Sequence, residues 1–282
     1  MQLSVGCAQW THAAWQERQP NPRERLRGYA DWCTAVEGNT TFYATPAHAT
    51  VQSWARQTPP GFRFVVKLPK TITHERRMRG AETELREFLA AVAPLGSRLH
   101  ALWVQLPASF GPTDLGALAR FLRELPPGYR HAVEVRHPAF FEDPRAAGQL
   151  EHVLSRVGAE WIPFDTTVLF AARPTSPGER EAWGKKPRVP RRTRALTDYP
   201  IVRYHGRDNL DATVAGWKPW LATVVNWLRE GRSPTMFIHT PDNAESLVLA
   251  RRFHAEVRTE LPELEPLPEP APTAPTTPMT LF

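Results

Sequence analysis

The chain has 282 residues, of which 41% are hydrophobic and 23% are charged, so it can form a sizeable core and is not disordered throughout. No apolar run approaches the roughly 20 residues that span a bilayer, and the N-terminus lacks the basic and apolar regions of a secretory signal. Cys7 and Cys33 are the only two cysteines, which excludes a disulfide framework. We therefore expect a cytoplasmic protein with no membrane partner.

Short apolar runs rich in β-forming residues predict eight strands, at Leu3–Cys7, Ala35–Asn39, Phe62–Lys67, Ala101–Gln105, Ala132–Val135, Glu160–Asp165, Ile201–His205 and Thr235–His239. The segments between and after them predict seven helices, at Gly28–Thr34, Ala47–Gln57, Glu82–Ala93, Leu115–Leu125, Ala146–Val157, Trp217–Arg229 and Ala244–Arg258. This alternation favours an α/β fold with a parallel sheet closed into a single (β/α)8 TIM-type barrel. An open doubly wound sheet is the alternative, although no G-x-G-x-x-G follows any strand.

Two segments stand apart in composition. Residues 166–200 lack a good helical pattern, and the part from Arg173 to Arg194 holds eight Lys/Arg and two Glu. This basic segment follows the sixth strand, so in a barrel it lies on the C-terminal face, where active sites occur. Residues 260–282 hold four Glu and no Lys/Arg and are rich in proline. We predict one barrel domain over residues 1–259 and a flexible, disordered tail over 260–282 that ends in a short apolar motif.

Polar side chains gather where the predicted strands end. The carboxyl ends of barrel strands open into one mouth. A single Glu or Arg there usually forms a buried ion pair, but so many polar groups at one rim are costly to bury unless a ligand binds. The candidates for this site are Glu37, Asn39, Tyr43, Lys67, His74, Glu134, Arg136, Asp165, Arg203, His205 and Arg207.

Several motifs resemble a known family. They are V-E-G-N-T-T-F-Y at 36–43, W-A-R-Q-T-P-P-G-F-R-F-V-V-K at 54–67, I-T-H at 72–74, Q-L-P-A-S-F at 105–110, A-V-E-V-R-H at 132–137 and V-R-Y-H-G-R at 202–207. In order and spacing they resemble the YecE-like family, also called domain of unknown function 72, from about Leu3 to Phe253. The resemblance implies a TIM-type barrel, in agreement with the strand count. It implies no activity, because none is established for the family.

The first of three hypotheses is that the mouth binds or processes a phosphate-bearing ligand, with nucleic acid or one of its components as the leading class. Lys67, Arg136, Arg203 and Arg207 would hold the anion, because arginine is suited to bidentate phosphate contacts. Glu134 and His205 would transfer any proton as catalytic groups. The remaining candidates would bind and orient the ligand: Glu37, Asn39, Tyr43, His74 and Asp165.

The basic segment extends this hypothesis to a polyanion. Its cations would contact a nucleic acid backbone, and Trp183 and prolines lie among them. A segment of this kind is as often only a solvated surface. The residues concerned are Lys185, Lys186, Arg188, Arg191, Arg192 and Arg194.

The second hypothesis is a metal-dependent hydrolase or isomerase that acts on a small metabolite. Zinc, manganese and magnesium are bound by carboxylates and histidines, which are present at Glu37, Glu134, Asp165, His205 and His239. The chain has no H-x-H or H-E-x-x-H pair. We therefore assign no metal ligand, and the cofactor stays unknown.

The third hypothesis is a non-enzymatic adaptor. The C-terminal residues 278–282 resemble the pentapeptide Gln-Leu-x-Leu-Phe with which bacterial proteins bind the DNA sliding clamp. Leu281 and Phe282 match, Met279 stands in for the first leucine, and Pro278 replaces the glutamine. An apolar tip on a proline-rich tether suits a hydrophobic groove on a partner. Whether the chain is an enzyme stays open.

Overall fold

The computed structural model describes residues 2–16 and 21–270. Its strands form one parallel sheet in the order β6-β5-β4-β3-β2-β1-β9-β8-β7. Each of the eight predicted strands is present, and the sixth is divided into two pieces. The strands are β1 (Ser4–Cys7), β2 (Ala35–Gly38), β3 (Arg63–Lys67), β4 (Leu99–Gln105), β5 (His131–Glu134), β6 (Glu160–Trp161), β7 (Phe164–Asp165), β8 (Ile201–His205) and β9 (Thr235–His239).

The two ends of the sheet, β6 and β7, are consecutive in the chain. They are separated only by Ile162 and Pro163, and proline has no N–H to donate to a sheet ladder. Ile162 N still donates to Val133 O of β5 at 2.8 Å, and Arg203 N of β8 donates to Pro163 O at 3.0 Å. The chain itself thus completes the ring at the divided strand, and no ladder joins β6 directly to β7.

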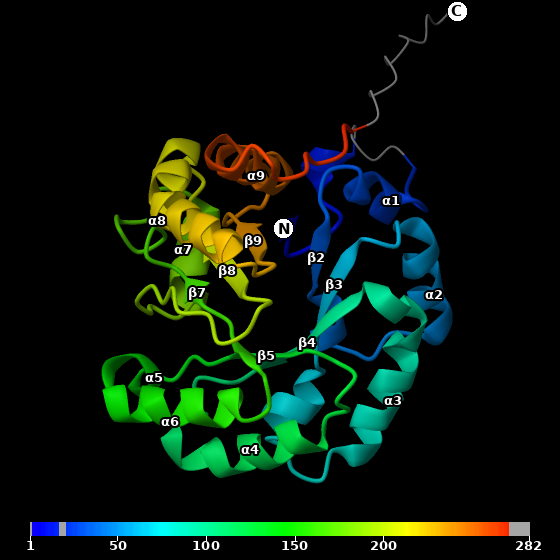
Figure 1. Ribbon diagram of the computed structural model, residues 1–282, viewed down its shortest axis with the longest axis vertical. Coiled ribbons are helices and arrows are strands. Elements are labelled where there is room, and N and C mark those ends of the chain that lie inside the picture. The colour runs from blue at the N-terminus through cyan, green and yellow to red at the C-terminus, as the bar shows by residue number, and fades with distance from the viewer. Residues whose placement is uncertain (1, 17–20, 271–282) are drawn as a thin grey trace, which may run out of the picture.

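Helices lie around the outside of the strands (Figure 1). Five of the seven predicted helices are found with shifts of at most two residues at their ends. The helix predicted at Trp217–Arg229 begins seven residues earlier, and the helix predicted at Gly28–Thr34 begins three residues earlier and ends four residues sooner. None of the helices in the described ranges is long and apolar enough to cross a membrane. The helices are α1 (Arg25–Ala30), α2 (His48–Gln57), α3 (Glu82–Val92), α4 (Leu115–Glu124), α5 (Ala139–Glu142), α6 (Pro144–Ser155), α7 (Pro177–Lys185), α8 (Leu210–Arg229) and α9 (Ser246–Glu260).

The helix α7 lies in the segment for which the sequence predicted no helix. Its first turn is fixed by local hydrogen bonds: Ser176 Oγ accepts from Glu179 N at 3.0 Å, and Glu179 Oε2 accepts from Thr175 N at 2.7 Å. Pro177 occupies the first helical position, where its missing N–H costs nothing. A capped start, and not an amphipathic repeat, therefore explains this helix.

The barrel interior has its own small apolar core. It is separate from the larger core that packs the outer face of the sheet against the helices. Within it, Trp103 and Phe237 stack with ring centroids 6.3 Å apart. The remaining members are Ala35, Val65, Ala101, Ala132, Ile162 and Ile201. The interior is thus filled with side chains below the mouth, as in other barrels of this size.

The first residues after α9 pack on the barrel, in contrast to the flexible tail expected from residue 260. Leu261 and Leu264 are buried, and Leu267 packs against the outer core. Arg258 Nε donates to Leu264 O at 2.8 Å. Leu264 N donates to Leu261 O at 3.0 Å, so the chain makes a turn directly after α9. A proline-rich composition is therefore compatible with packing in this segment.

Candidate functional site at the barrel mouth

The polar layer at the mouth follows from the two-residue period of a strand. Side chains two residues apart share a face, so Glu37 lies on the same face as the interior core residue Ala35, and Lys67 on that of Val65. Each is one step nearer the carboxyl end of its strand. The same step from other interior residues gives Gln105 after Trp103, Glu134 after Ala132, Arg203 after Ile201 and His239 after Phe237.

Glu37 is the centre of this layer. Its Oε1 lies 2.6 Å from Lys67 Nζ and 3.0 Å from Arg203 Nη2. Its Oε2 accepts from Arg203 Nε at 3.0 Å and lies 2.9 Å from His239 Nε2. Lys67 also donates to Asn39 Oδ1 at 2.9 Å. Side chains from β2, β3, β8 and β9 are therefore joined in one buried network.

Glu134 is the second carboxylate of the mouth. Arg136 Nε and Nη2 both lie 2.7 Å from Glu134 Oε1. Arg203 Nη1 lies 3.7 Å from Glu134 Oε2, so Arg203 spans the two carboxylates. Arg203 is buried, whereas the Arg136 side chain is 21% exposed and can be reached from solvent.

Two aromatic rings support these cations from within the barrel. Lys67 Nζ lies 4.7 Å from the centroid of the Trp103 ring, and the Arg203 guanidinium lies 4.6 Å from that of Phe164. The faces of aromatic rings attract cations. Sequence reasoning missed both rings, although the strand period places each on the inner face.

The charges of the cluster favour ionised carboxylates. Burial opposes ionisation of Glu37, but Arg203 and Lys67 outweigh it, so its pKa lies well below the ordinary value. The pKa of Glu134 is also lowered, because Arg136, Arg203 and Lys67 outweigh burial. Burial and the charge of Arg203 lower the pKa of Lys67 to about 8. At neutral pH both carboxylates are negative and Lys67 is mainly positive.

The two buried histidines of the mouth are neutral at pH 7. Burial and the charge of Arg203 lower the pKa of His239 to about 4. Burial, His239 and Lys186 lower that of His205 well below its ordinary value. The His205 ring stacks on His239 with centroids 5.8 Å apart. Its Nδ1 donates to Gly206 O at 3.2 Å, so its Nε2 is left as an acceptor.

The rim carries the more accessible candidates. His74 is half-buried, and burial and the charge of Arg136 lower its pKa to about 4. Its ring packs edge-on against Phe42 with centroids 5.0 Å apart. The adjacent Tyr43 is 68% exposed. Through Phe42, which also packs edge-on against Tyr43, these side chains are linked to one another.

Asp165 lies outside the cluster. Its neighbour Phe164 faces the interior, so Asp165 faces the helices, where its Oδ2 accepts from Trp220 Nε1 at 2.6 Å and from Arg191 Nε at 2.7 Å. Its Oδ1 accepts from Thr167 N at 2.9 Å. These bonds anchor the basic segment to the barrel. They leave Asp165 turned away from the place where we expected it to orient a ligand.

Arg207 is also held away from the cluster. Its Nε donates to Glu179 Oε1 at 3.0 Å, and its Nη2 donates to Glu179 Oε2 at 2.7 Å. This bidentate pair fixes α7 against the end of β8, and a further bond joins Arg207 to Arg173 O. Arg207 is thus used in positioning α7.

Most cations of the basic segment are already paired. Arg188 lies over the Phe170 ring, and Lys186 interacts electrostatically with Arg203 and Glu37 of the mouth. The other four form ion pairs: Lys185 with Glu181, Arg191 with Asp165, and Arg192 and Arg194 with Glu151. The segment is therefore not a row of free cations.

The remaining expectations concern metals and the C-terminus. In residues 2–16 and 21–270, no group of three or more His, Cys, Asp and Glu side chains could hold a metal ion. Glu37 and His239 are adjacent, but Lys67 and Arg203 surround the carboxylate and their charges oppose a second cation. The residues expected to contact a clamp, Met279, Leu281 and Phe282, lie outside the described residues.

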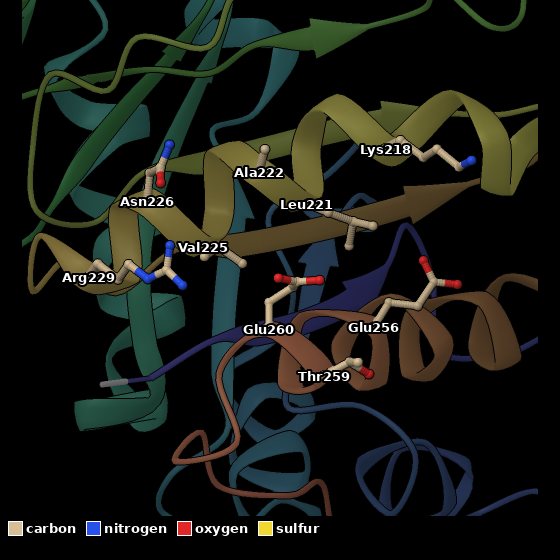
Figure 2. Close-up of a pocket in the computed structure, with 9 residues that line it drawn as sticks. All are labelled: Lys218, Leu221, Ala222, Val225, Asn226, Arg229, Glu256, Thr259 and Glu260. Atoms are coloured by element: carbon tan, nitrogen blue, oxygen red, sulfur yellow. The ribbon is translucent and has the colours of Figure 1, made fainter.

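A groove of about 530 Å³ lies between α8 and α9 (Figure 2). Lys218 and Arg229 line it from α8, and Glu256 and Glu260 line it from α9. No residue predicted for the site is part of its lining.

Comparison with known proteins identifies the family. The chain matches the family described as "Protein of unknown function DUF72" over residues 4–274. It belongs to the DUF72 family. It is 36% identical over 266 residues to the UPF0759 protein YecE of Escherichia coli, in both strain K12 and O157:H7. These alignments cover 94% of this chain and 96% of the relative.

Solved DUF72 structures share the fold. A DUF72 family protein from Enterococcus faecalis V583 superposes with a TM-score of 0.67 at 19% identity, over 93% of this chain and 96% of that one. One from Thermotoga maritima MSB8 superposes with a TM-score of 0.65 at 22% identity, over 93% of this chain and 100% of that one. The resemblance stated from the motifs is thus confirmed, and so is the fold that it implied.

Proposed function

We propose that the barrel mouth binds a small molecule through a phosphate group. The observation that carries the proposal is an imbalance of charge around the buried network. Two carboxylates, Glu37 and Glu134, form ion pairs with three cations, and the histidines are neutral. The cations are Lys67, Arg136 and Arg203. A net positive charge in a largely buried site is costly unless an anion completes it.

Arg136 supplies the open donor of the site. It uses Nε and Nη2 on Glu134, and its Nη1 makes no hydrogen bond to any residue in the described ranges. A guanidinium matches the geometry of phosphate oxygens and stays charged at every physiological pH. Glu134 holds this guanidinium in place, which lowers the entropic cost of binding.

The pairing of the basic segment favours a small ligand over a nucleic acid chain. Four of its six predicted cations are engaged by Glu181, Asp165 and Glu151. A phosphate backbone needs several free cations along a surface. A nucleotide or another small phosphate ester needs only the mouth.

We assign any proton transfer to Glu134 and His205, both as acceptors at neutral pH. The lowered pKa of Glu134 makes it an ionised carboxylate. The His205 Nε2 is an acceptor because Nδ1 donates to Gly206 O.

Cys7 and Cys33 are free, buried thiols, which suits a reducing cytoplasm.

Titration calorimetry at pH 7, where Lys67 is mainly protonated, tests the proposal with two matched probes. Phenyl phosphate is a monoester dianion, and dimethyl phosphate is a diester monoanion. We expect the intact protein to bind phenyl phosphate more tightly. Arg136→Gln should weaken that binding about tenfold or more, since one hydrogen bond to a charged group contributes about 1.5–3 kcal/mol.

Arg145→Gln is the control, because it removes the same charge from an exposed side chain on α6. It should leave the affinity unchanged. Absence of phenyl phosphate binding to the intact protein, or an equal loss in both variants, would overturn the proposal.

A further inference from the structure

We propose that Lys186 is a ligand-contacting residue of the mouth that makes the site select a dianion over a monoanion. This inference rests on the proposed function and deepens it. It moves Lys186 from the set of surface cations expected to contact nucleic acid into the ligand site. Three features of Lys186 support the proposal: its fixed backbone, the charges with which it interacts, and the absence of a hydrogen-bonding partner in the described residues.

The backbone on both sides of Lys186 is fixed. Lys186 is the C-terminal cap of α7, where its N donates to Ala182 O at 2.9 Å. The next residue, Pro187, accepts from Thr166 Oγ1 through its carbonyl at 2.9 Å. Four residues after Pro187, Arg191 donates to Asp165 Oδ2 at 2.7 Å. The short stretch 186–191 is therefore tied to the end of the divided sixth strand at two points.

The fixed backbone places Lys186 beside the mouth, between the end of α7 and the residues that follow β7. The groups with which its charge interacts are Arg203, Glu37, Arg136 and Glu134, and its charge is also felt by His205 and His239. These residues come from β2, β5, β8 and β9 and from the turn after β5. Lys186 thus adds a cation from the segment after the divided sixth strand to this network.

Lys186 lacks a partner in the described part of the chain. It makes no hydrogen bond or ion pair there, although its side chain is half-buried. Its neighbour Lys185 is exposed and pairs with Glu181 at 2.6 Å. A partly desolvated ammonium with no directly bonded carboxylate is unfavourable unless a ligand supplies an anionic partner. Lys185 therefore has an ion-pair partner, whereas Lys186 is left to bind a ligand.

The net charge of the mouth determines whether it prefers a monoanion or a dianion. Without Lys186, Lys67, Arg136 and Arg203 exceed Glu37 and Glu134 by one positive charge, which a monoanion neutralises. With Lys186 the excess is two, which a phosphate monoester dianion neutralises. Lys186 is therefore the residue that should separate monoesters from diesters.

The test is calorimetry at pH 7.5 with phenyl phosphate and dimethyl phosphate on the intact protein, Lys186→Gln and Lys185→Gln. We expect Lys186→Gln to bind phenyl phosphate at least about tenfold more weakly and to lose most of its preference over dimethyl phosphate. Lys185→Gln should keep both properties. Thermal unfolding of each variant checks that the barrel is intact.

The outcomes separate the two proposals. If the intact protein binds phenyl phosphate and Lys186→Gln binds it equally well, this inference is wrong and the proposed function stands. An equal loss in Lys185→Gln would also overturn it. The loss of affinity would then come from the total positive charge of the basic segment and not from direct contact with Lys186. If the intact protein binds neither probe, the proposed function fails and this inference fails with it.

Discussion

Lys67 Nζ lies 2.6 Å from Glu37 Oε1, and both side chains are buried on adjacent strands. Removing two such charges from water costs several kcal/mol per ion, and their attraction offsets that cost only with good geometry and further hydrogen bonds. Those bonds are present, since Arg203 and His239 also contact Glu37. A buried charge cluster is not required for the stability of a barrel, so this arrangement is consistent with the ligand site proposed above.

Loss of Arg203 should destabilise the barrel. Arg203→Met would leave Glu37 and Glu134 without the guanidinium that spans them, at a cost of about 3–5 kcal/mol. Urea denaturation measures the free energy of unfolding. Arg27→Met removes an exposed arginine that pairs with Glu24 and should change it little. A loss below about 1 kcal/mol in Arg203→Met would mean that the carboxylates are not held as described.

Asp165 should control how firmly the segment 186–191 is held. Asp165→Asn removes the charge that Arg191 and Trp220 contact, so trypsin should cleave within residues 185–194 faster than in the intact protein. Glu181→Gln is the control, because its pair with Lys185 is exposed and contributes little. Equal cleavage rates in both variants would show that Asp165 does not anchor the segment.

Stability should fall as the pH is lowered below neutrality. Burial and the charges of Arg258 and Arg251 lower the pKa of His254 to about 4 from 6.5. The unfolded chain therefore binds a proton that the folded chain excludes. The contribution of neutral His254 is complete above pH 6.5 and is lost as the pH falls toward 4. His254→Leu should lose less stability than the intact protein between pH 7 and pH 5, as followed by urea denaturation. Parallel losses would contradict this.

The segment after α9 should contribute to stability through its leucines. Leu264 is 2% exposed, and replacing a buried leucine with alanine costs about 2–5 kcal/mol. We expect Leu264→Ala to lower the free energy of unfolding by an amount near the lower end of that range. Glu265→Ala, at an exposed neighbouring position, should have little effect. If the two variants unfold alike, the leucine is not packed as described.

The strands of the barrel could be predicted because each strand is marked by a short run of neighbouring residues in the sequence. Buried parallel strands are continuous apolar runs, and the predicted bounds of Ile201–His205 and Thr235–His239 match β8 and β9. The division of the sixth strand at Pro163 also has a local cause, since proline cannot donate to the ladder. Helix α7 was missed because it depends on the cap at Ser176 and has no amphipathic repeat.

The site could be predicted only in part. Their positions at the carboxyl ends of the predicted strands placed Glu37, Lys67, Glu134 and Arg203 at one mouth, and the structure brings them together. The sequence could not show that Asp165 faces Trp220, because that requires the register of the divided strand. Nor could it distinguish Lys186 from Lys185, because the direction of each side chain depends on where α7 ends.

The most direct test of the central claim is a crystal structure of the protein soaked in tungstate, a tetrahedral dianion with a strong anomalous signal. The account predicts an anomalous peak in the barrel mouth, within hydrogen-bonding distance of Arg136 Nη1 and Lys186 Nζ. Peaks confined to surface lysines and arginines, with none in the mouth, would contradict it.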